Sequence, residues 1–541
     1  MSDLPAELVT RIAEYVHPGD SVPFALSSRL LHACIKQTLQ AYKERAGELR
    51  TIHDRDPVRL VELLRSFMRE PELRYFVRTF EVWAIRTKPG DWTWDSLGFG
   101  SREWEDGQPH EAEHDYSAAI GDQSFFGPEE LTNYQVFLQE SLGFATAFAN
   151  RCIDRIVQGD DQPLKTMLMA LCSRLNTIVF VNKRQFGTHH NPFELLDHTF
   201  RNLYQRHEHQ QPWHYFQNVR RVITGVAHPA IWTHGCWYHP FWSENASLFL
   251  LPSIQNLTFD MTNFDNIGGT YQWEWAPRVS NICELVFDAN ANGDAETFDS
   301  LMSGVKALRV IRGFNWGIKK SQFIDSLGKH QSHCVEELSL ADFHINSIAN
   351  SDEMAKLKEL TSLRTIHLAL TDFISGAPYL RTKVERENWM RSNPDPAVMI
   401  RLTDTLPCSI ENVRFSGVVD VPVLAESRSF LQMLNELVSS KFGGRYMALR
   451  HLCIACIRSR RYLDGGPAWQ AQRGLQMTAR LRSGLQPSGT EELTALRECC
   501  EANGVALHGW DPISYRNKQP CSLCTDHDVV ELSPVLGYDG W

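Results

Sequence analysis

A short apolar pattern that recurs along most of the chain is the feature that most limits how it can fold. The pattern reads apolar-x-x-apolar-x-apolar, and it occurs nine times between Val77 and Ile454. The middle residues from Leu257 to Ile366 are spaced 28, 23, 30 and 28 residues apart. The nine copies are Val77-Phe80-Val82, Leu175-Ile178-Phe180, Ile254-Leu257-Phe259, Ile282-Leu285-Phe287, Val305-Leu308-Val310, Val335-Leu338-Leu340, Leu363-Ile366-Leu368, Ile410-Val413-Phe415 and Leu449-Leu452-Ile454.

Each copy has the alternation of a short β-strand whose apolar side chains point into a core. Stretches with a helical pattern, such as 297–303, 321–328 and 354–360, lie between successive copies. A strand followed by a helix, repeated every 23 to 30 residues, stacks into a solenoid with parallel strands. The sequence therefore predicts the α/β class, as an irregular solenoid in which parallel strands alternate with helices. An ordinary α/β domain is the alternative, because its strands also alternate with helices.

The first 45 residues are expected to form three short helices. Leu8, Ile12 and Val16 recur at helical spacing and give the first helix an apolar face. A His-Pro-Gly-Asp turn ends that helix, and the serines that follow can cap two more. Helices this short bury little surface, so the module either completes its core against a partner or simply caps the domain that follows.

The residues of this module also resemble a known family. The segments LPAELVTRIAEYV and SVPFALSSRLLHACI, joined by the turn, are similar to the F-box over about 40 residues. Members of that family bind the Skp-type adaptor of cullin-based ubiquitin ligases through this module. Leu30 and Leu31 stand where a tryptophan often follows the arginine. The resemblance implies that the adaptor-binding residues are Leu4, Pro5, Leu8, Ile12, Val16, Ala25, Leu26 and Arg29.

The repeat array, from Arg74 to Trp510, resembles the irregular leucine-rich repeats that follow some F-boxes. The two resemblances together imply an F-box/leucine-rich-repeat substrate receptor of a cullin-RING ubiquitin ligase. Such a chain is not an enzyme and needs no cofactor. It binds the adaptor at one end and holds a target protein, here unknown, on its array. A free-standing repeat scaffold that binds other proteins outside the ligase is the alternative.

In each expected strand, the residue between the last two core positions should point to the solvent face of the sheet. Three basic side chains in this row, Arg309, His367 and Arg414, favour an acidic or phosphorylated target segment. A solvated face without a role is the alternative, and a slip of one residue would bury the row. The row reads Thr258, Val286, Arg309, Ser339, His367, Arg414 and Cys453, and the predicted target-binding residues are Arg309, Ser339, His367 and Arg414.

Two stretches interrupt the array. Residues 101–130 carry one arginine against nine acidic residues, which indicates an exposed and disordered excursion. Residues 189–242 are rich in His, Trp and Tyr, fit no copy of the repeat and are expected to form an insertion or a binding loop. The expected division is therefore 1–45 F-box module, 46–87 helical linker and first repeat, 88–130 acidic excursion, 131–188 repeat, 189–242 insertion, 243–458 repeat array and 459–541 repeat remnant and tail.

Composition excludes several classes of partner and compartment. The net charge of −11 argues against a nucleic-acid partner bound through a basic face. No apolar run approaches the roughly 18 to 20 residues of a membrane span, and the first residues do not form a secretory signal. Thirteen irregularly spaced cysteines favour reduced thiols. We therefore expect a protein of the cytoplasm, the nucleus or both, with no membrane partner.

Several motifs resemble metal sites, but their context favours none of them. His110-Glu111-x-x-His114 matches the zinc metallopeptidase motif, yet no apolar helical stripe surrounds it. A metallopeptidase is therefore only a remote alternative. The pairs Cys453/Cys456 and Cys521/Cys524 are too far apart for a usual zinc pair, although a zinc site in the tail, at Cys521 and Cys524, stays open. We expect no metal, and no catalytic residue.

Overall fold

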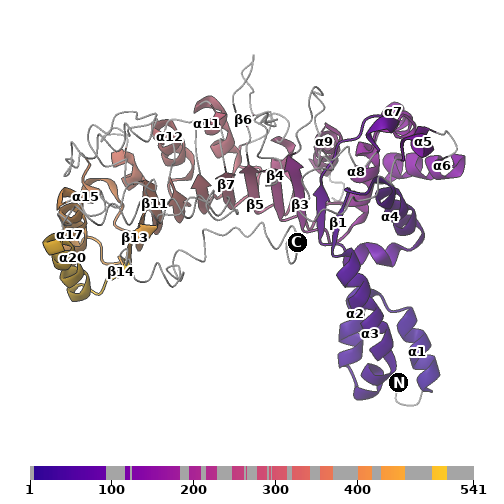
Figure 1. The fold of residues 1–541 in the computed structure, drawn as a ribbon, viewed down its shortest axis with the longest axis horizontal. Coiled ribbons are helices and arrows are strands. Elements are labelled where there is room, and N and C mark those ends of the chain that lie inside the picture. The colour runs from indigo at the N-terminus through magenta and orange to yellow at the C-terminus, as the bar shows by residue number, and fades with distance from the viewer. Residues whose placement is uncertain are drawn as a thin grey trace, which may run out of the picture. The chain divides into compact units, whose positions relative to one another are not determined.

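The computed structural model describes the chain from residue 5 to residue 508, with gaps. The described ranges are 5–92, 116–121, 125–182, 194–208, 215–227, 246–260, 263–264, 277–288, 292–293, 295–313, 320–340, 354–369, 400–416, 428–456 and 490–508. The chain divides into two compact units. The first is Met1–Cys283 with Gly304–Lys306, and the second is Glu284–Ser303 with Ala307–Trp541. Each unit alternates parallel strands with helices (Figure 1).

The first unit begins with three helices, α1 (Ala6–Glu14), α2 (Pro18–Leu26) and α3 (Arg29–Leu49), which we call the helical module. The Ser28 side chain caps α3 by accepting a hydrogen bond from the Leu31 backbone N–H at 3.1 Å. With 21 residues, α3 is longer than the short helix that the sequence led us to expect. Ala13, Ala25 and Ile35 form the core of the module, one from each helix.

The module packs against the rest of the first unit through the 3₁₀ helix η1 (Pro71–Phe76). His17 meets the ring of Tyr75 edge-on, with 4.9 Å between ring centroids. Tyr42, on α3, packs against Phe76 at 5.6 Å. Aromatic contacts therefore join the module to the elements that follow it.

Five strands of the first unit pair in parallel and in chain order. They are β1 (Thr51–His53), β2 (Thr79–Val82), β3 (Thr177–Asn182), β4 (Arg221–Ala227) and β5 (Asn256–Asp260). Their register aligns five buried residues in one row across the strands, namely Ile52, Phe80, Ile178, Val222 and Leu257. The remaining elements are the helices α4 (Pro57–Arg69), α5 (Ser117–Gly121), α6 (Pro128–Val136), α7 (Thr146–Val157), α8 (Gln162–Leu171) and α9 (Glu194–Glu208), the π-helical turn η4 (Phe137–Ser141), the 3₁₀ turns η2 (Pro89–Asp91) and η6 (Ala246–Leu250), and the short strand β6 (Asn263–Phe264).

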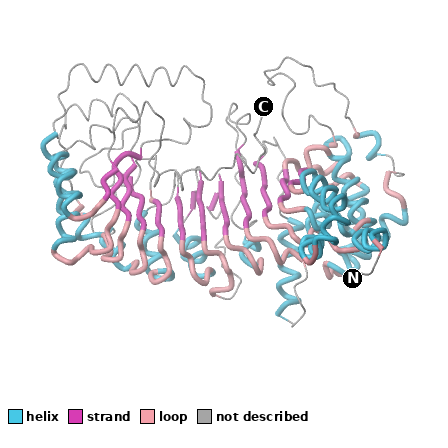
Figure 2. Tube along the Cα trace, turned by 90° about the horizontal axis from the view of Figure 1, so that it is seen from below, coloured by secondary structure: helices cyan, strands magenta, loops and turns pink. Residues whose placement is uncertain are grey.

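Seven strands of the second unit follow the same rule, and Figure 2 shows the strands side by side. They are β7 (Glu284–Asp288), β9 (Val310–Gly313), β10 (Glu337–Ser339), β11 (Thr365–Ala369), β12 (Asn412–Ser416), β13 (His451–Cys456) and β14 (Ala506–His508). Leu285, Ile311, Leu338, Ile366, Val413 and Leu452 form the aligned, fully buried row. The other elements are α11 (Ala295–Gly304), α12 (Lys320–Gln331), η7 (Lys356–Glu359), α15 (Leu402–Thr405), α17 (Arg428–Phe442), α20 (Thr490–Ala502) and β8 (Asn292–Gly293).

The α/β class with parallel strands alternating with helices, expected from the sequence, is confirmed. Eight of the nine apolar copies place their middle residue in a strand. The exception is Val305-Leu308-Val310, because β9 begins only at Val310 and Ile311 is the residue aligned with Leu285 and Leu338. The true copy is Leu308-x-x-Ile311-x-Gly313, whose glycine does not match the apolar pattern.

The stretch 189–242 needs correction. Its described residues contain α9 and β4, and β4 pairs with both β3 and β5 as a strand of the array. The sequence hid this copy because Thr224 occupies the third, usually apolar, position. The described ends of the expected excursion 88–130 likewise hold η2, α5 and the start of α6, and Trp92 there is fully buried.

Candidate interaction surfaces

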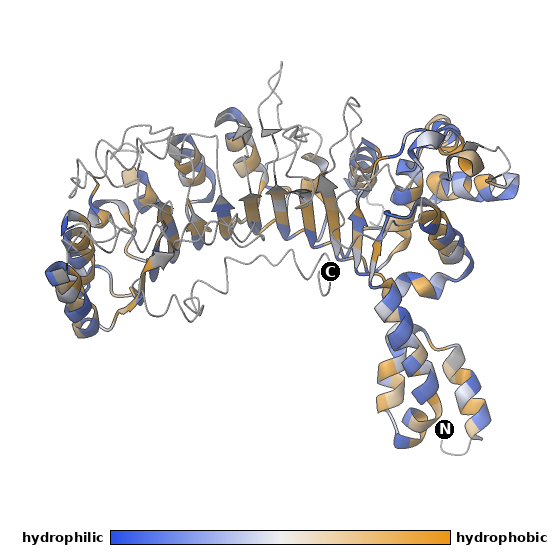
Figure 3. Ribbon diagram, in the orientation of Figure 1, coloured by the Kyte–Doolittle hydropathy of each residue, from blue (hydrophilic) through white to orange (hydrophobic). Residues whose placement is uncertain are grey.

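The helical module exposes apolar side chains that its own core does not use. On α1, Leu8 and Ile12 follow one another at helical spacing and are 49% and 42% exposed. Tyr15, which caps the end of α1, is 83% exposed. Val22, Leu26 and Leu30 add further exposed apolar surface from α2 and the start of α3. Figure 3 colours these helices by hydropathy. Only three other large apolar residues in the described ranges are at least 42% exposed, and none of them belongs to the module.

Helix α1 is apolar on two faces, and among the described residues only one of them packs in the module core. Val9 and Ala13 are buried, and Ala13 packs in the module core. Leu8 and Ile12 precede these residues by one position, which turns them about 100° around the helix and away from that core. A helix that only covered its own module would carry polar residues at such positions. The second face is therefore a candidate docking surface.

The other predicted adaptor-binding residues differ in how exposed they are. Pro5 and Arg29 are exposed, at the start of α1 and of α3. Val16 is half-buried, and its carbonyl accepts a hydrogen bond from the Tyr42 hydroxyl at 3.2 Å. Ala25 is buried in the module core, so it supports the fold rather than the surface. Leu4 lies outside the described residues.

The predicted target-binding row is present on the strands of the second unit with one change. Register places Val286, Arg312, Ser339, His367, Arg414, Cys453 and His508 opposite one another, and we call these residues the strand row. Arg309 does not belong to it, because it precedes β9 and is exposed. Arg312 takes its place. The sequence did not predict Arg312, because the pattern puts the middle residue of that copy at Leu308, whereas the strand has it at Ile311.

Three members of the strand row, Arg312, Ser339 and His367, make polar contacts on the sheet. Arg312 forms ion pairs with Glu284 at 3.2 Å and with Glu337 at 2.9 Å. The Ser339 hydroxyl lies 3.2 Å from Nδ1 of His367. Burial, together with the positive charge of Arg414, lowers the pKa of His367 to about 4. His367 is therefore neutral near pH 7.

The strand row is more buried than the sequence led us to expect. Val286, Ser339, Arg414 and Cys453 are buried, whereas we expected this row to point to solvent. Neighbouring strands lie about 4.8 Å apart, so long side chains such as Arg312 and His367 cover shorter ones between them. His367, His451 and His508 are only partly buried, and the row is not sealed from solvent.

A second polar group, which the sequence did not predict, lies inside the first unit. Asp54, Arg86, Asp161 and Lys165, the ionic cluster, are all buried. Lys165 Nζ lies 2.6 Å from Asp54 and 2.8 Å from Asp161, and Arg86 pairs with Asp161 at 3.0 Å. Although burial favours the neutral acid, Lys165 and Arg86 hold the pKa of Asp54 below its usual value.

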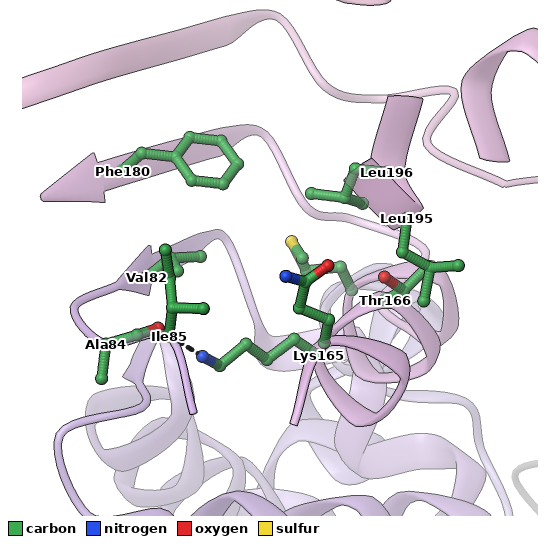
Figure 4. Close-up of a pocket in the computed structure, with 10 residues that line it drawn as sticks. Val82, Ala84, Ile85, Lys165, Thr166, Phe180, Leu195 and Leu196 are labelled. Carbon is green, nitrogen blue, oxygen red and sulfur yellow. Dashed lines mark hydrogen bonds between the residues drawn. The ribbon is translucent and has the colours of Figure 1, made fainter. Parts of the chain in front are cut away.

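Lys165 also lines a small, mostly apolar cavity (Figure 4). Its Nζ also donates a hydrogen bond to the Ala84 carbonyl at 2.6 Å. Val82, Phe180, Leu195 and Leu196 line the cavity around it. Because each charge of the cluster is paired with an opposite one, we interpret the cluster as structural.

The expected metal motifs fall largely outside the described residues. His110, His114, Cys521 and Cys524 lie in ranges that the structure does not describe. Within the described ranges, no group of three His, Cys, Asp or Glu side chains is placed to hold a metal ion. No helix in those ranges combines the length and the apolar character needed to cross a membrane.

Comparison of the chain with protein-family models and with curated protein sequences gives no match.

Proposed function

We propose that this chain is the non-catalytic substrate receptor of a Skp/cullin/F-box ubiquitin ligase, in the cytoplasm or nucleus. The helical module would bind the Skp-type adaptor, and the strand array would hold a target protein. The observation that carries the proposal is the second apolar face of α1, where Leu8, Ile12 and Tyr15 lie exposed. These residues fall within the segment that resembles the F-box.

The energetics of this face agree with a docking role. Burying one Leu or Ile side chain fully contributes about 1.5–3 kcal/mol. Several half-exposed apolar side chains on adjacent helices can therefore supply a substantial part of the energy of a stable complex, after the cost of association. The receptor would then accelerate ubiquitin transfer by holding a target at high effective concentration near the charged enzyme.

Capture by a purified Skp-type adaptor tests the proposal. The double variant Leu8→Asp/Ile12→Asp places two carboxylates on the proposed interface, where burying unpaired charge costs several kcal/mol. We expect loss of capture with an unchanged circular dichroism spectrum, because both side chains are exposed in the free protein.

Val136→Asp is the matched control, since Val136 is 43% exposed on a helix outside the module. It should bind the adaptor as the unmodified protein does. Equal capture of the double variant would refute the assignment of this face. A wild-type chain that does not bind the adaptor at all would favour the free-standing scaffold.

A further inference from the structure

Arg414 is a buried cation of the strand row. It lies on β12 and is only 6% exposed, and its Nε atom has no hydrogen-bond partner. Among the residues that the structure describes, no carboxylate pairs with it. Arg86, the other buried arginine among the described residues, pairs with Asp161, and the partly buried Arg312 pairs with two glutamates. An unpaired buried charge is unfavourable, so its retention calls for a reason.

Two histidines beside Arg414 also have buried ring nitrogens without a partner. His367 on β11 is directly opposite Arg414, and its Nε2 atom is unpartnered. His451 on β13 lies two residues before Cys453, which is opposite Arg414, and its Nδ1 atom is unpartnered. Residues two apart on a strand share a face, so all three side chains lie on the same face of adjacent strands.

The Ser339 hydroxyl lies 3.2 Å from Nδ1 of His367 and can donate a hydrogen bond to it. In that tautomer the neutral ring carries its N–H on Nε2, which makes Nε2 a donor, like Nε of Arg414. The Glu284 and Glu337 carboxylates pair with Arg312 and belong to β7 and β10, neither of which is adjacent to β12. Among the described residues, no carboxylate forms an ion pair with Arg414.

We infer that Arg414, His367 and His451 form a binding site for a phosphate-monoester group. A phosphate dianion has three acceptor oxygens, which suits N–H groups on one face of three adjacent strands, and its charge would balance the guanidinium. A phosphorylated side chain of a target and free phosphate are two sources of the same chemistry. The inference deepens the proposed function, on which it rests for the identity of the bound protein, by giving the strand array a class of target.

Isothermal titration of the full chain tests the site. The probes are inorganic phosphate, a phosphoserine peptide, and the same peptide with serine or glutamate in place of phosphoserine. We expect binding of the phosphorylated probes only. Arg414→Gln should weaken that binding at least tenfold, and Arg414→Lys, which keeps the charge but loses the fork of donors, should fall between Arg414→Gln and wild type.

Arg364→Gln is the control, because Arg364 is an exposed arginine on the turn that precedes β11. It should bind within twofold of wild type. Arg414→Gln should also melt at the same temperature as the unliganded wild type or higher, because it removes an unpaired buried charge. Binding of inorganic phosphate but not of the phosphopeptide would support the site with free phosphate as its source.

Three results would overturn the inference: no binding of either phosphorylated probe, equal affinity for the phosphoserine and glutamate peptides, or a markedly lower melting temperature for Arg414→Gln. Adaptor capture by Arg414→Gln should stay intact in every case. A failure of this site is therefore distinguishable from a failure of the proposed function.

Discussion

Replacing Lys165 by Met should destabilise the first unit strongly, because Lys165 is the cation that Asp54 and Asp161 share. Met keeps most of the side-chain volume and removes the charge. Asp161 keeps Arg86 at 3.0 Å, but Asp54 loses its one ion-pair partner among the described residues and stays fully buried. Breaking a buried ion pair by removing one partner costs about 3–5 kcal/mol. We expect a loss of that size in the free energy of unfolding.

Lys356→Met is the matched control. Lys356 pairs with Asp325 at 2.5 Å, but both side chains are close to half exposed. Such a pair contributes about 0–1 kcal/mol. Urea unfolding, followed by circular dichroism and tryptophan fluorescence, measures both variants. A loss below about 1 kcal/mol for Lys165→Met would refute the reasoning that the cluster is held by its charges.

The same variant carries a pH signature. The pKa of Asp54 is lowered in the native wild type, so its contribution to stability is present above its ordinary value of 3.8 and is lost as pH falls through the lowered value. Without Lys165, burial favours the protonated acid. The stability difference between variant and wild type should therefore shrink as the pH is lowered from 7 toward 4. A difference that does not change with pH would mean that Asp54 is not the source of the loss.

Two further predictions concern the first unit and the cysteines. Gly159→Ala should destabilise the first unit by about 1–3 kcal/mol, because Gly159 has φ +89° and an added Cβ would lie 2.5 Å from the backbone nitrogen of Pro89. Gly47→Ala, where nothing lies within 4 Å of the added atom, is the control in the same unfolding assay, and equal effects would contradict the steric argument. Burial raises the pKa of Cys152 to about 11, so a thiol-directed reagent at pH 8 should label the exposed Cys408 well before Cys152. Peptide mass spectrometry measures the two labelling rates, and equal rates would contradict this prediction.

The middle position of the repeat was predictable because it is the most buried one. Phe80, Ile178, Leu338 and Val413 are fully buried, and only apolar residues fit there. The third position tolerates other residues, and this is where the sequence reasoning failed. Asp54, the residue after β1, occupies it in that copy, Thr224 in β4 and Gly313 in β9. Each of these strands was missed or placed out of phase.

The candidate sites were predictable to different degrees. Leu8 and Ile12 could be found from the segment that resembles the F-box, whereas the burial of Ala25 depends on how three helices pack. Arg414 was found because β12 kept its phase, and Arg312 was missed because β9 did not. The ionic cluster left one signal in the sequence. Lys165 is the one charged residue of the segment QPLKTMLMAL, and a charge in a helix that is otherwise uncharged and largely apolar indicates a buried partner.

The register between two parallel strands does not depend on how many residues connect them. Thr365 pairs with Glu337 across 28 residues and with Asn412 across 47, yet both pairings align the same rows of side chains. The hydrogen bonds of the ladder involve only strand residues. A connection can therefore become longer during evolution without displacing the strands that it joins. Differences in length among homologues should therefore concentrate between strands. The spacing of core residues across the ladder would then be inherited unchanged.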